Sequence, residues 1–310
     1  KSHAAAMAVT AFHVAHLKRY YPTEFYCALL NEQPMGFYSP EVIANDARRH
    51  DVAILPIDVN HSVVECLMEP ALESKRDAVR LGYRYLKSLG PAAWERLEAE
   101  RARGPYRSLR DFWRRTRLGR GAIEALIQVG AFAWTGLHER ELIWQLGTFY
   151  QPLGTQMPLN LTSTESLPAL RELSKKERIV IDMVLQGIAV RGLQMDLVAD
   201  QLHEGITPSH LLNDLPVDAS VTVAGLVAVR QSPETAKGFV FHTLEDYSGL
   251  MNIITKPALI PKFRRLIESA PALIVQGRIE RQERSTNVIA ERFEALPIVS
   301  DAERRVHTFG

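Results

Sequence analysis

Apolar residues follow a helical period over most of the chain and a strand-like period near its end. From residue 4 to 20 they recur every three or four positions, which predicts a helix that Pro22 ends. A second helix is expected over 23–31, with Thr23 as its N-cap. The chain therefore opens with two helices.

The helical period continues through the middle of the chain. Ser39-Pro40 is a cap followed by proline at the first helical position, and it predicts a helix to about His50. The stretch "VAILPIDVN" looks extended, and Pro56 confines it to an edge or an irregular strand. Residues 79–136 are expected to be helical, with breaks at Gly90-Pro91, Gly104-Pro105 and Gly119.

A boundary is predicted where the composition becomes polar. The stretch "PLGTQMPLNLTSTESLP" has the proline and polar content of a linker, so a domain should end before it. Ser174, with Glu177 three residues later, predicts a capping box at the start of a helix that runs to Gln186.

From Ser220 onward the period changes to two. Five short strands are predicted: "VTVAGLVAV", "GFVFHTLED", "LMNIIT", "ALIVQGRIE" and "NVIAERFEAL". One helical segment, 256–269, lies between the third and the fourth strand. Five strands with a helix after the third have the order of an OB-fold barrel. The predicted fold class is multidomain, with helical domains followed by an all-β barrel.

Composition places the chain among soluble globular proteins. Of its 310 residues, 46% are apolar and 24% charged, which is enough apolar material for a core. No run reaches the ~18–20 apolar residues that span a bilayer, and no signal peptide is visible. Cys27 and Cys66 are too few for a disulfide framework. We therefore expect a cytoplasmic protein with no membrane partner.

Charge adds a candidate surface. The whole chain carries a net charge of only +1. The segment from residue 101 to 120, however, contains one acid, Asp111, and eight arginines: Arg101, Arg103, Arg107, Arg110, Arg114, Arg115, Arg117 and Arg120. A local charge of +7 indicates a polyanionic partner or a solvated helix face. The absence of lysine favours phosphate, because the planar guanidinium pairs bidentately with phosphate oxygens.

Two hairpin patterns flank this arginine segment. In "YLKSLGPAAW" a helix is expected to end at Lys87, with a tight turn at Ser88-Leu89-Gly90 before the next helix. This form is typical of a helix-hairpin-helix, which presents backbone N–H groups to a DNA phosphate. A second unit, "RLGRGAIEALIQVGAF", follows, and the alternative is a helical bundle with ordinary turns. The candidate DNA-binding residues are Lys87, Ser88, Leu89, Gly90, Arg101, Arg103, Arg107, Arg114, Arg115, Arg117 and Arg120.

The barrel offers a second candidate surface. Phe239 and Phe241 share one face of a predicted strand, while Val240, His242 and Leu244 share the other. One set fills the barrel, and the sequence does not decide which. Outward phenylalanines would stack on bases of single-stranded DNA. The basic residues that flank these strands would follow the phosphates or solvate the strand edges: Arg230, Lys237, Lys256, Arg278 and Arg281.

Catalytic and metal-binding patterns are not found. His13 and His16 are three apart on a helix, but no third ligand stands at a matching interval, so we expect no metal site. The chain has no GxSxG, no P-loop and no Asp-x-Asp strand that would hold two magnesium ions. We therefore expect no catalytic residue in this segment.

Several motifs together resemble one family. The stretch "KSHAAAMAVTAFHVAHLKRYYPTEF" resembles the fingers of bacterial C-family DNA polymerases, related to the polymerase III α subunit, and "ILPIDVNHS" is similar to a Leu-Pro-Pro-Asp-Val-Asn-x-Ser run there. "RLGYRYLKSLG" resembles the entry to their tandem helix-hairpin-helix domain, and "HTLEDYSGLMNII" resembles their OB domain. "NEQPMGFYSPEVIANDARRH" is similar to the error-prone, ImuC-type branch.

The resemblance implies a division into domains. It predicts the end of the fingers over 1–75, tandem hairpins over 76–150, a linker with helices over 151–218, an OB-fold domain over 219–298 and a tail over 299–310. A PHP domain and a palm with three catalytic aspartates are expected before Lys1. By analogy, Lys1, Ser2 and His3 lie near the incoming deoxynucleotide.

The resemblance also implies a function. The chain is expected to be the C-terminal, DNA-binding portion of a translesion polymerase that extends a primer 3′ end. Mg²⁺ is expected to bind outside this segment. Implied partners are primer-template DNA, single-stranded template, deoxynucleotides, a sliding clamp and damage-tolerance accessory proteins. The segment alone is expected to be inactive as a polymerase.

This sequence departs from the family pattern at several positions. Ser88 replaces a usual glycine, Ala133 stands at a usual aspartate, and "RGLQMDL" replaces a segment that usually carries His-Pro. Gln194–Val198 resembles a clamp-binding pentapeptide without the terminal aromatic residue. The alternative is a stand-alone or truncated DNA-binding module without enzymatic function, or a fragment that docks other proteins.

Overall fold

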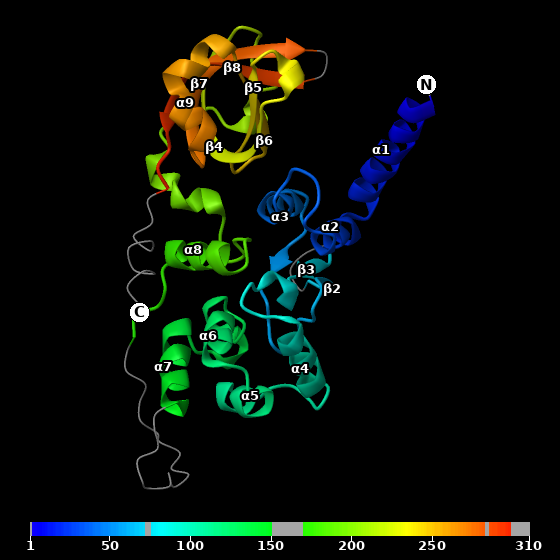
Figure 1. Cartoon of the computed structure of the whole chain (residues 1–310), viewed down its shortest axis with the longest axis vertical. Coiled ribbons are helices and arrows are strands. Elements are labelled where there is room, and N and C mark those ends of the chain that lie inside the picture. Colours follow the sequence, from blue (N-terminus) through cyan, green and yellow to red (C-terminus); the bar gives the residue numbers. More distant parts are fainter. Residues whose placement is uncertain (1, 72–75, 151–169, 283–284, 299–310) are drawn as a thin grey trace. The chain divides into compact units, whose positions relative to one another are not determined.

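The computed structural model describes residues 2–71, 76–150, 170–282 and 285–298. The chain forms two compact units, coloured along the sequence in Figure 1. The first contains Lys1–Asn31 and Val52–Arg191, and the second contains Glu32–Asp51 and Gly192–Gly310. This division differs from the expected domain ranges in two ways. Part of the expected linker joins the hairpins, and part of the expected fingers joins the barrel.

The first unit is mainly helical, with one small sheet. Its elements are α1 (Ser2–Tyr20), α2 (Pro22–Asn31), β1 (Ile54–Leu55), β2 (Leu67–Glu69), β3 (Ala78–Arg80), α4 (Pro91–Arg101), α5 (Leu109–Thr116), α6 (Arg120–Gln128), α7 (Glu139–Phe149) and α8 (Lys175–Leu185).

The first two helices lie where the apolar period predicts them. Thr23, however, is not an N-cap, because α2 already begins at Pro22. The Thr23 hydroxyl is buried and donates to the Asp77 carbonyl at 3.0 Å. It therefore joins α2 to the small sheet.

The prediction of a helical region from residue 79 is wrong for its first residues. β3 pairs in parallel with β1 and antiparallel with β2, and a 3-10 turn over Tyr83–Tyr85 follows it. Both tyrosines are buried and donate to distant carbonyls, Tyr83 to Val59 O at 3.2 Å and Tyr85 to Leu30 O at 2.6 Å. These long-range hydrogen bonds hold the segment in place, and β3 and the 3-10 turn stand where the sequence predicts a helix before the first hairpin.

Helices α4 to α8 enclose one apolar core. Leu97, Phe112, Leu126, Leu142 and Ile179 are each almost completely buried, one from each of the five helices. Helix α6 packs against both α7 and α8. The capping box predicted at Ser174 and Glu177 is present at the start of α8. Helix α8 is thus an integral part of the hairpin unit.

The second unit is a closed barrel with two helices. Its elements are α3 (Pro40–Arg49), β4 (Ser220–Gln231), β5 (Val240–Glu245), β6 (Leu250–Thr255), α9 (Ile260–Ser269), β7 (Ala272–Gln282) and β8 (Ser285–Ala295). The strand order is β4-β5-β6-β8-β7, with β6 and β8 parallel and the other pairs antiparallel. All five predicted strands and the helix between the third and fourth are confirmed, and the barrel is OB-like.

Helix α3 is anchored to this barrel by a buried carboxylate. Ser39 caps α3 as predicted, accepting from the Val42 N–H. Glu245, at the end of β5, accepts hydrogen bonds from Arg49 at 2.8 Å and from Asn45 at 3.2 Å. Burial raises the pKa of Glu245, and Arg49 opposes that rise by stabilising the charged form.

The observed fold class is mixed: a helical region followed by an OB-like barrel, as the periods predict. In the described part of the chain no helix combines the length and apolar character needed to cross a membrane.

The barrel wall leaves no room for a side chain at Gly277. A Cβ there would meet Ile289 O at 2.3 Å and Val288 Cγ1 at 2.8 Å. We expect Gly277→Ala to lower the free energy of unfolding of the barrel by about 1–3 kcal/mol, because strand β8 would have to move. Urea unfolding followed by circular dichroism measures this.

Gly147 in α7 is the matched control. A Cβ there meets nothing within 4 Å, so Gly147→Ala should raise stability by ~0.5–1 kcal/mol through helix propensity. Equal effects of the two substitutions would contradict the barrel packing described above.

Candidate nucleic-acid interface

The eight arginines between residues 101 and 120 divide into three groups. Two of them have their guanidinium groups bound inside the protein. Arg101 donates to His61 O at 3.0 Å and to Ser62 O. Arg115 donates to Glu100 O and to Gly104 O at 2.9 Å, and lies 4.4 Å over the Tyr106 ring. These two arginines hold loops together, which corrects their prediction as DNA ligands.

Two more arginines pair with a carboxylate on their own helix or its end. Arg103 pairs with Glu100 at 2.9 Å, and Arg120 pairs with Glu124 at 2.7 Å. Both guanidiniums remain more than half exposed. Exposed pairs of this kind contribute little to stability, so phosphate can replace the carboxylate.

The remaining four form one exposed surface, which we call the α5 stripe: Arg107, Arg110, Arg114 and Arg117. Arg110 and Arg114 lie on α5, Arg107 precedes its N-cap Ser108 and Arg117 is its C-cap, and all four are exposed. Arg107, Arg114 and Arg117 have no ion pair or side-chain hydrogen bond within the described residues, and Arg110 lies 5.4 Å over the Phe149 ring. The opposite face of α5, with Leu109, Phe112 and Thr116, is buried.

Two residues of this surface were not among the predicted ligands. Arg110 belongs to the stripe, and the three-four-three spacing in the sequence was a signal that could have found it. Arg96 on α4 donates to the Thr116 and Arg117 carbonyls at 3.4 and 3.5 Å, at the C-terminal end of α5. A cation at that end complements the helix dipole.

The first hairpin ends in an uncapped helix N-terminus. Leu89 is buried and its N–H donates to Leu86 O at 2.9 Å, while Lys87, Ser88 and Gly90 are exposed. Gly90 is the N-cap of α4 and makes no side-chain cap hydrogen bond. The first N–H groups of a helix are natural donors to a phosphate. Ser88 in place of glycine leaves this geometry intact.

The second hairpin turn does not present its N–H groups. Val129 and Ala131 are buried, and the Gly130 and Ala131 N–H groups donate to Ile127 O and Leu126 O. The exposed N-terminus in this unit is that of α6, where Gly119 is the N-cap, again without a side-chain cap. It begins two residues after the last arginine of the α5 stripe.

The phenylalanines of the barrel face outward. Val240, His242 and Leu244 are buried in the interior, whereas Phe239 and Phe241 are half-buried on the outer face. Phe241 pairs with Ile254 on β6, and Ile254 pairs with Ile289 on β8. The strand register therefore extends the aromatic surface into an apolar row across three strands. The two isoleucines are a part of the patch that periodicity alone did not locate.

The five basic residues predicted near this patch differ in their contacts. Arg230 donates to Ala270 O at 2.9 Å, Arg278 pairs with Glu291 at 2.9 Å, and Arg281 donates to the Asn213 and Leu215 carbonyls. Lys237 and Lys256 are exposed, and neither has a partner within the described residues. Gly238 lies against Pro257, which brings the loops that carry these two lysines together.

The other predicted sites receive less support. His3 is exposed on α1, and the side chains of Lys1 and Ser2 lie outside the described residues, so nucleotide binding there stays a prediction. In the pentapeptide Gln194–Val198, Met195, Leu197 and Val198 are buried in a core cluster, which leaves no accessible clamp-binding motif there. Among the described residues no group of three His, Cys, Asp or Glu can hold a metal ion.

One buried histidine lies behind the aromatic patch. His242 Nε2 lies 2.9 Å from Ile267 O, and its Nδ1 is buried with no partner in the described structure. Burial lowers the pKa of His242, and the Arg230 guanidinium beside it lowers it further. The ring is therefore held neutral inside the barrel.

This predicts an acid-sensitive barrel. A histidine whose folded pKa lies below the ordinary 6.5 binds its proton more tightly when unfolded, so stability should fall as the pH drops below 6.5. The loss is at most about 1.4 kcal/mol per pH unit. Urea unfolding between pH 7.5 and 5.5 should show a smaller loss in His242→Gln than in the wild type; equal losses would contradict the assignment.

Comparison with known proteins identifies one motif family and several relatives. A helix-hairpin-helix motif family matches residues 51–142. The error-prone DNA polymerase of Anaeromyxobacter dehalogenans is 36% identical over the whole chain and 28% of its own length, and that of Corynebacterium efficiens is 37% identical over 96% of the chain and 27% of its own length. Among solved structures, asparaginyl-tRNA synthetase from Pyrococcus horikoshii matches 33% of the chain and 26% of its own, at 18% identity and a TM-score of 0.27, too low to support a conclusion.

The chain thus spans less than a third of the length of these relatives. The likeness is continuous along the chain, and the hairpin motif lies where the sequence predicts it. On this evidence the chain is similar, over its whole length, to a portion of error-prone DNA polymerases.

Proposed function

We propose that this chain is the DNA-binding portion of an error-prone polymerase that synthesises across damaged template. The hairpin unit holds the primer-template duplex, and the barrel holds the single-stranded template. The observation that carries this proposal is the α5 stripe, four exposed arginines on α5 and at its two ends with no carboxylate partner among the described residues.

The stripe suits a phosphate backbone for electrostatic reasons. Each arginine that neutralises a phosphate releases counterions, so binding is strong at low salt and independent of base sequence. The uncapped N-termini of α4 and α6 add N–H donors that suit phosphate oxygens. A polymerase needs this kind of contact, because it must hold any template.

The barrel patch suits single-stranded DNA. Phe239 and Phe241 offer flat faces on which bases can stack, and Lys237 and Lys256 lie close enough to follow the phosphates. The face formed by the second and third strands is also the usual binding face of OB-folds.

Nucleotide addition is proposed for the longer protein. Its catalytic metal ions, and the carboxylates that hold them, are proposed to lie outside this segment. Deoxynucleotides are its proposed substrates. A sliding clamp and accessory proteins are proposed partners of the longer protein, and the cytoplasm is its proposed location.

Charge reversal in the α5 stripe should weaken DNA binding. We expect Arg114→Glu/Arg117→Glu to raise the Kd for a fluorescent primer-template duplex at least about tenfold. The slope of log K against log salt should become shallower by about one to two units, since each lost phosphate contact removes ~0.9. Anisotropy titrations over a series of KCl concentrations measure both quantities.

Arg264→Glu/Arg265→Glu on α9 is the matched control. It changes the net charge by the same amount on an exposed helix of the other unit. If the two double variants weakened binding equally, the effect would come from net charge alone and the stripe would not be the duplex site.

Loss of the outer aromatic ring should weaken single-strand binding. Phe241→Ala should cost ~1–3 kcal/mol in binding an oligo(dT) strand, because one stacked base loses its platform. Phe241→Trp should retain the affinity, since it keeps an aromatic face. Wild-type affinity for oligo(dT) in the alanine variant would exclude base stacking at this position.

A further inference from the structure

The C-terminal end of α8 contacts both parts of the proposed duplex site. On one side, the Lys87 N–H donates to Leu185 O and its Nζ donates to Val184 O, both at 3.1 Å. On the other side, Arg191 Nη2 donates to Gln128 O, at the end of α6, at 2.7 Å. The first hairpin and α6 are therefore held by the same eight residues, 184–191.

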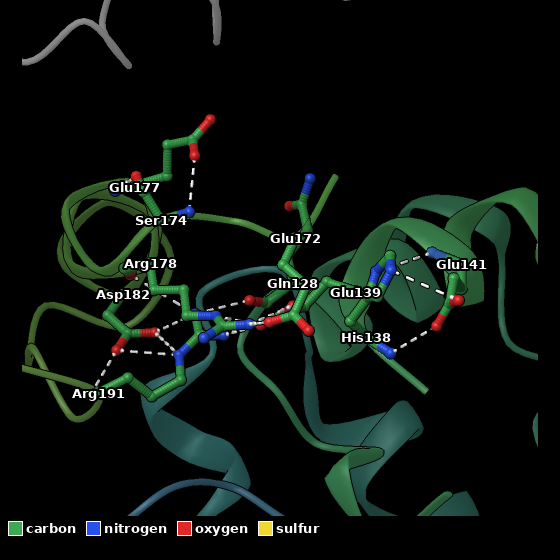
Figure 2. Close-up of polar contacts among 10 residues, drawn as sticks. All are labelled: Gln128, His138, Glu139, Glu141, Glu172, Ser174, Glu177, Arg178, Asp182 and Arg191. Carbon is green, nitrogen blue, oxygen red and sulfur yellow. Dashed lines mark hydrogen bonds and ion pairs between the residues drawn. The ribbon is translucent and has the colours of Figure 1, made fainter. Parts of the chain in front are cut away.

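Arg191 makes this connection with its whole guanidinium fork (Figure 2). Its Nη2 also donates to Asp182 Oδ1 at 2.6 Å, its Nε to the same oxygen at 3.1 Å, and its Nη1 to Glu139 Oε1 at 2.6 Å. Three helices, α6, α7 and α8, thus meet on one side chain. A lysine ammonium has no planar fork and cannot reach three helices in these directions at once.

The carboxylate that receives this fork is completely buried. Asp182 also accepts from the N–H groups of Val190 and Arg191, each at 3.0 Å, so the turn after α8 folds back over it. Gly187 takes a positive φ of 76° to allow that turn. Arg178 pairs with Glu139 at 3.1 Å and completes the cluster that Figure 2 shows.

Helix α6 follows the α5 stripe directly in the chain, so its position constrains the position of the stripe. Arg117, the last arginine of the stripe, is separated from Gly119, the N-cap of α6, by one residue. Helices α4 and α5 are also joined directly, because Arg115 on α5 donates to Glu100 O on α4 and to Gly104 O at 2.9 Å. The hydrogen bonds through the end of α8 are a second connection, between the first hairpin and α6.

We propose that Arg191 is a positioning residue for DNA: by joining α6 to the end of α8, it fixes the distance between the first hairpin and the α5 stripe, so that both contact one duplex together. This inference rests on the proposed function. Arg191 is itself half-buried and touches no DNA. Its effect is to make two weak contacts act as one bivalent site.

Arg191→Lys tests this, because it keeps a positive charge beside Asp182 and Glu139 while losing the fork. The full chain is titrated with a fluorescent primer-template duplex over a series of KCl concentrations, at a temperature where circular dichroism shows each variant folded. We expect the Kd to rise about tenfold and the salt slope to become shallower by about one unit or more. Arg140→Lys, whose parent side chain pairs only with Glu177 in the described cluster, is the control and should bind as wild type.

Hydrogen exchange gives an independent readout that holds even where the lysine variant loses stability. In the wild type, DNA should slow exchange at both the 88–92 and the 119–123 amides. In Arg191→Lys only one of the two segments should be protected. Protection of both segments, or an unchanged Kd and salt slope, would overturn the positioning role alone; no salt-dependent binding by the wild type would overturn the proposed function as well.

Discussion

The hairpin unit depends on one buried ion pair, between Asp182 and Arg191. Neither charge is compensated by water, since Asp182 has no exposed surface and Arg191 is largely covered. A pair of this kind adds little net stability compared with an apolar pair of the same size, but removing one partner costs about 3–5 kcal/mol. Its value is therefore geometric. It specifies which helix ends meet, and it does so for segments that are far apart in the sequence.

The same residue type has two different roles in this unit. Arg101, Arg115 and Arg191 donate to backbone carbonyls of loops and helix ends and so hold the unit together. The α5 stripe has no such acceptors and faces solvent. The difference lies in the backbone. Carbonyls at loop bends and helix ends have no helical partner and accept hydrogen bonds from a nearby guanidinium, whereas carbonyls inside a helix are already paired. Fewer arginines are therefore available to a partner than the eight in the sequence, and four of them lie together in the α5 stripe.

Much of the fold could be predicted because it is local. The change of period at Ser220 located all five barrel strands, and capping residues located α3 and α8. The strand β3 and the 3-10 turn that ends at Tyr85 could not be predicted, because hydrogen bonds to carbonyls more than twenty residues away hold this segment. Thr23 was misassigned for the same reason.

The candidate site shows the same limit. The arginine-rich segment was visible in the sequence, and so was the spacing of the four arginines on α5 and at its ends. What the sequence could not show is which arginines are already bound, because the acceptors of Arg101 and Arg191 lie on other elements. Likewise, alternation defined two faces of β5, but only closure of the barrel decided that Phe241 faces outward.

The central claim is that exposed arginines of α5 bind phosphate while buried arginines do not. NMR spectra of the arginine side-chain Nε–Hε groups, recorded as primer-template DNA is added, test this directly. The account predicts shifts for Arg107, Arg110, Arg114 and Arg117, and unchanged signals for Arg101, Arg115 and Arg191. Shifts confined to the second group, or to arginines of the barrel, would contradict it.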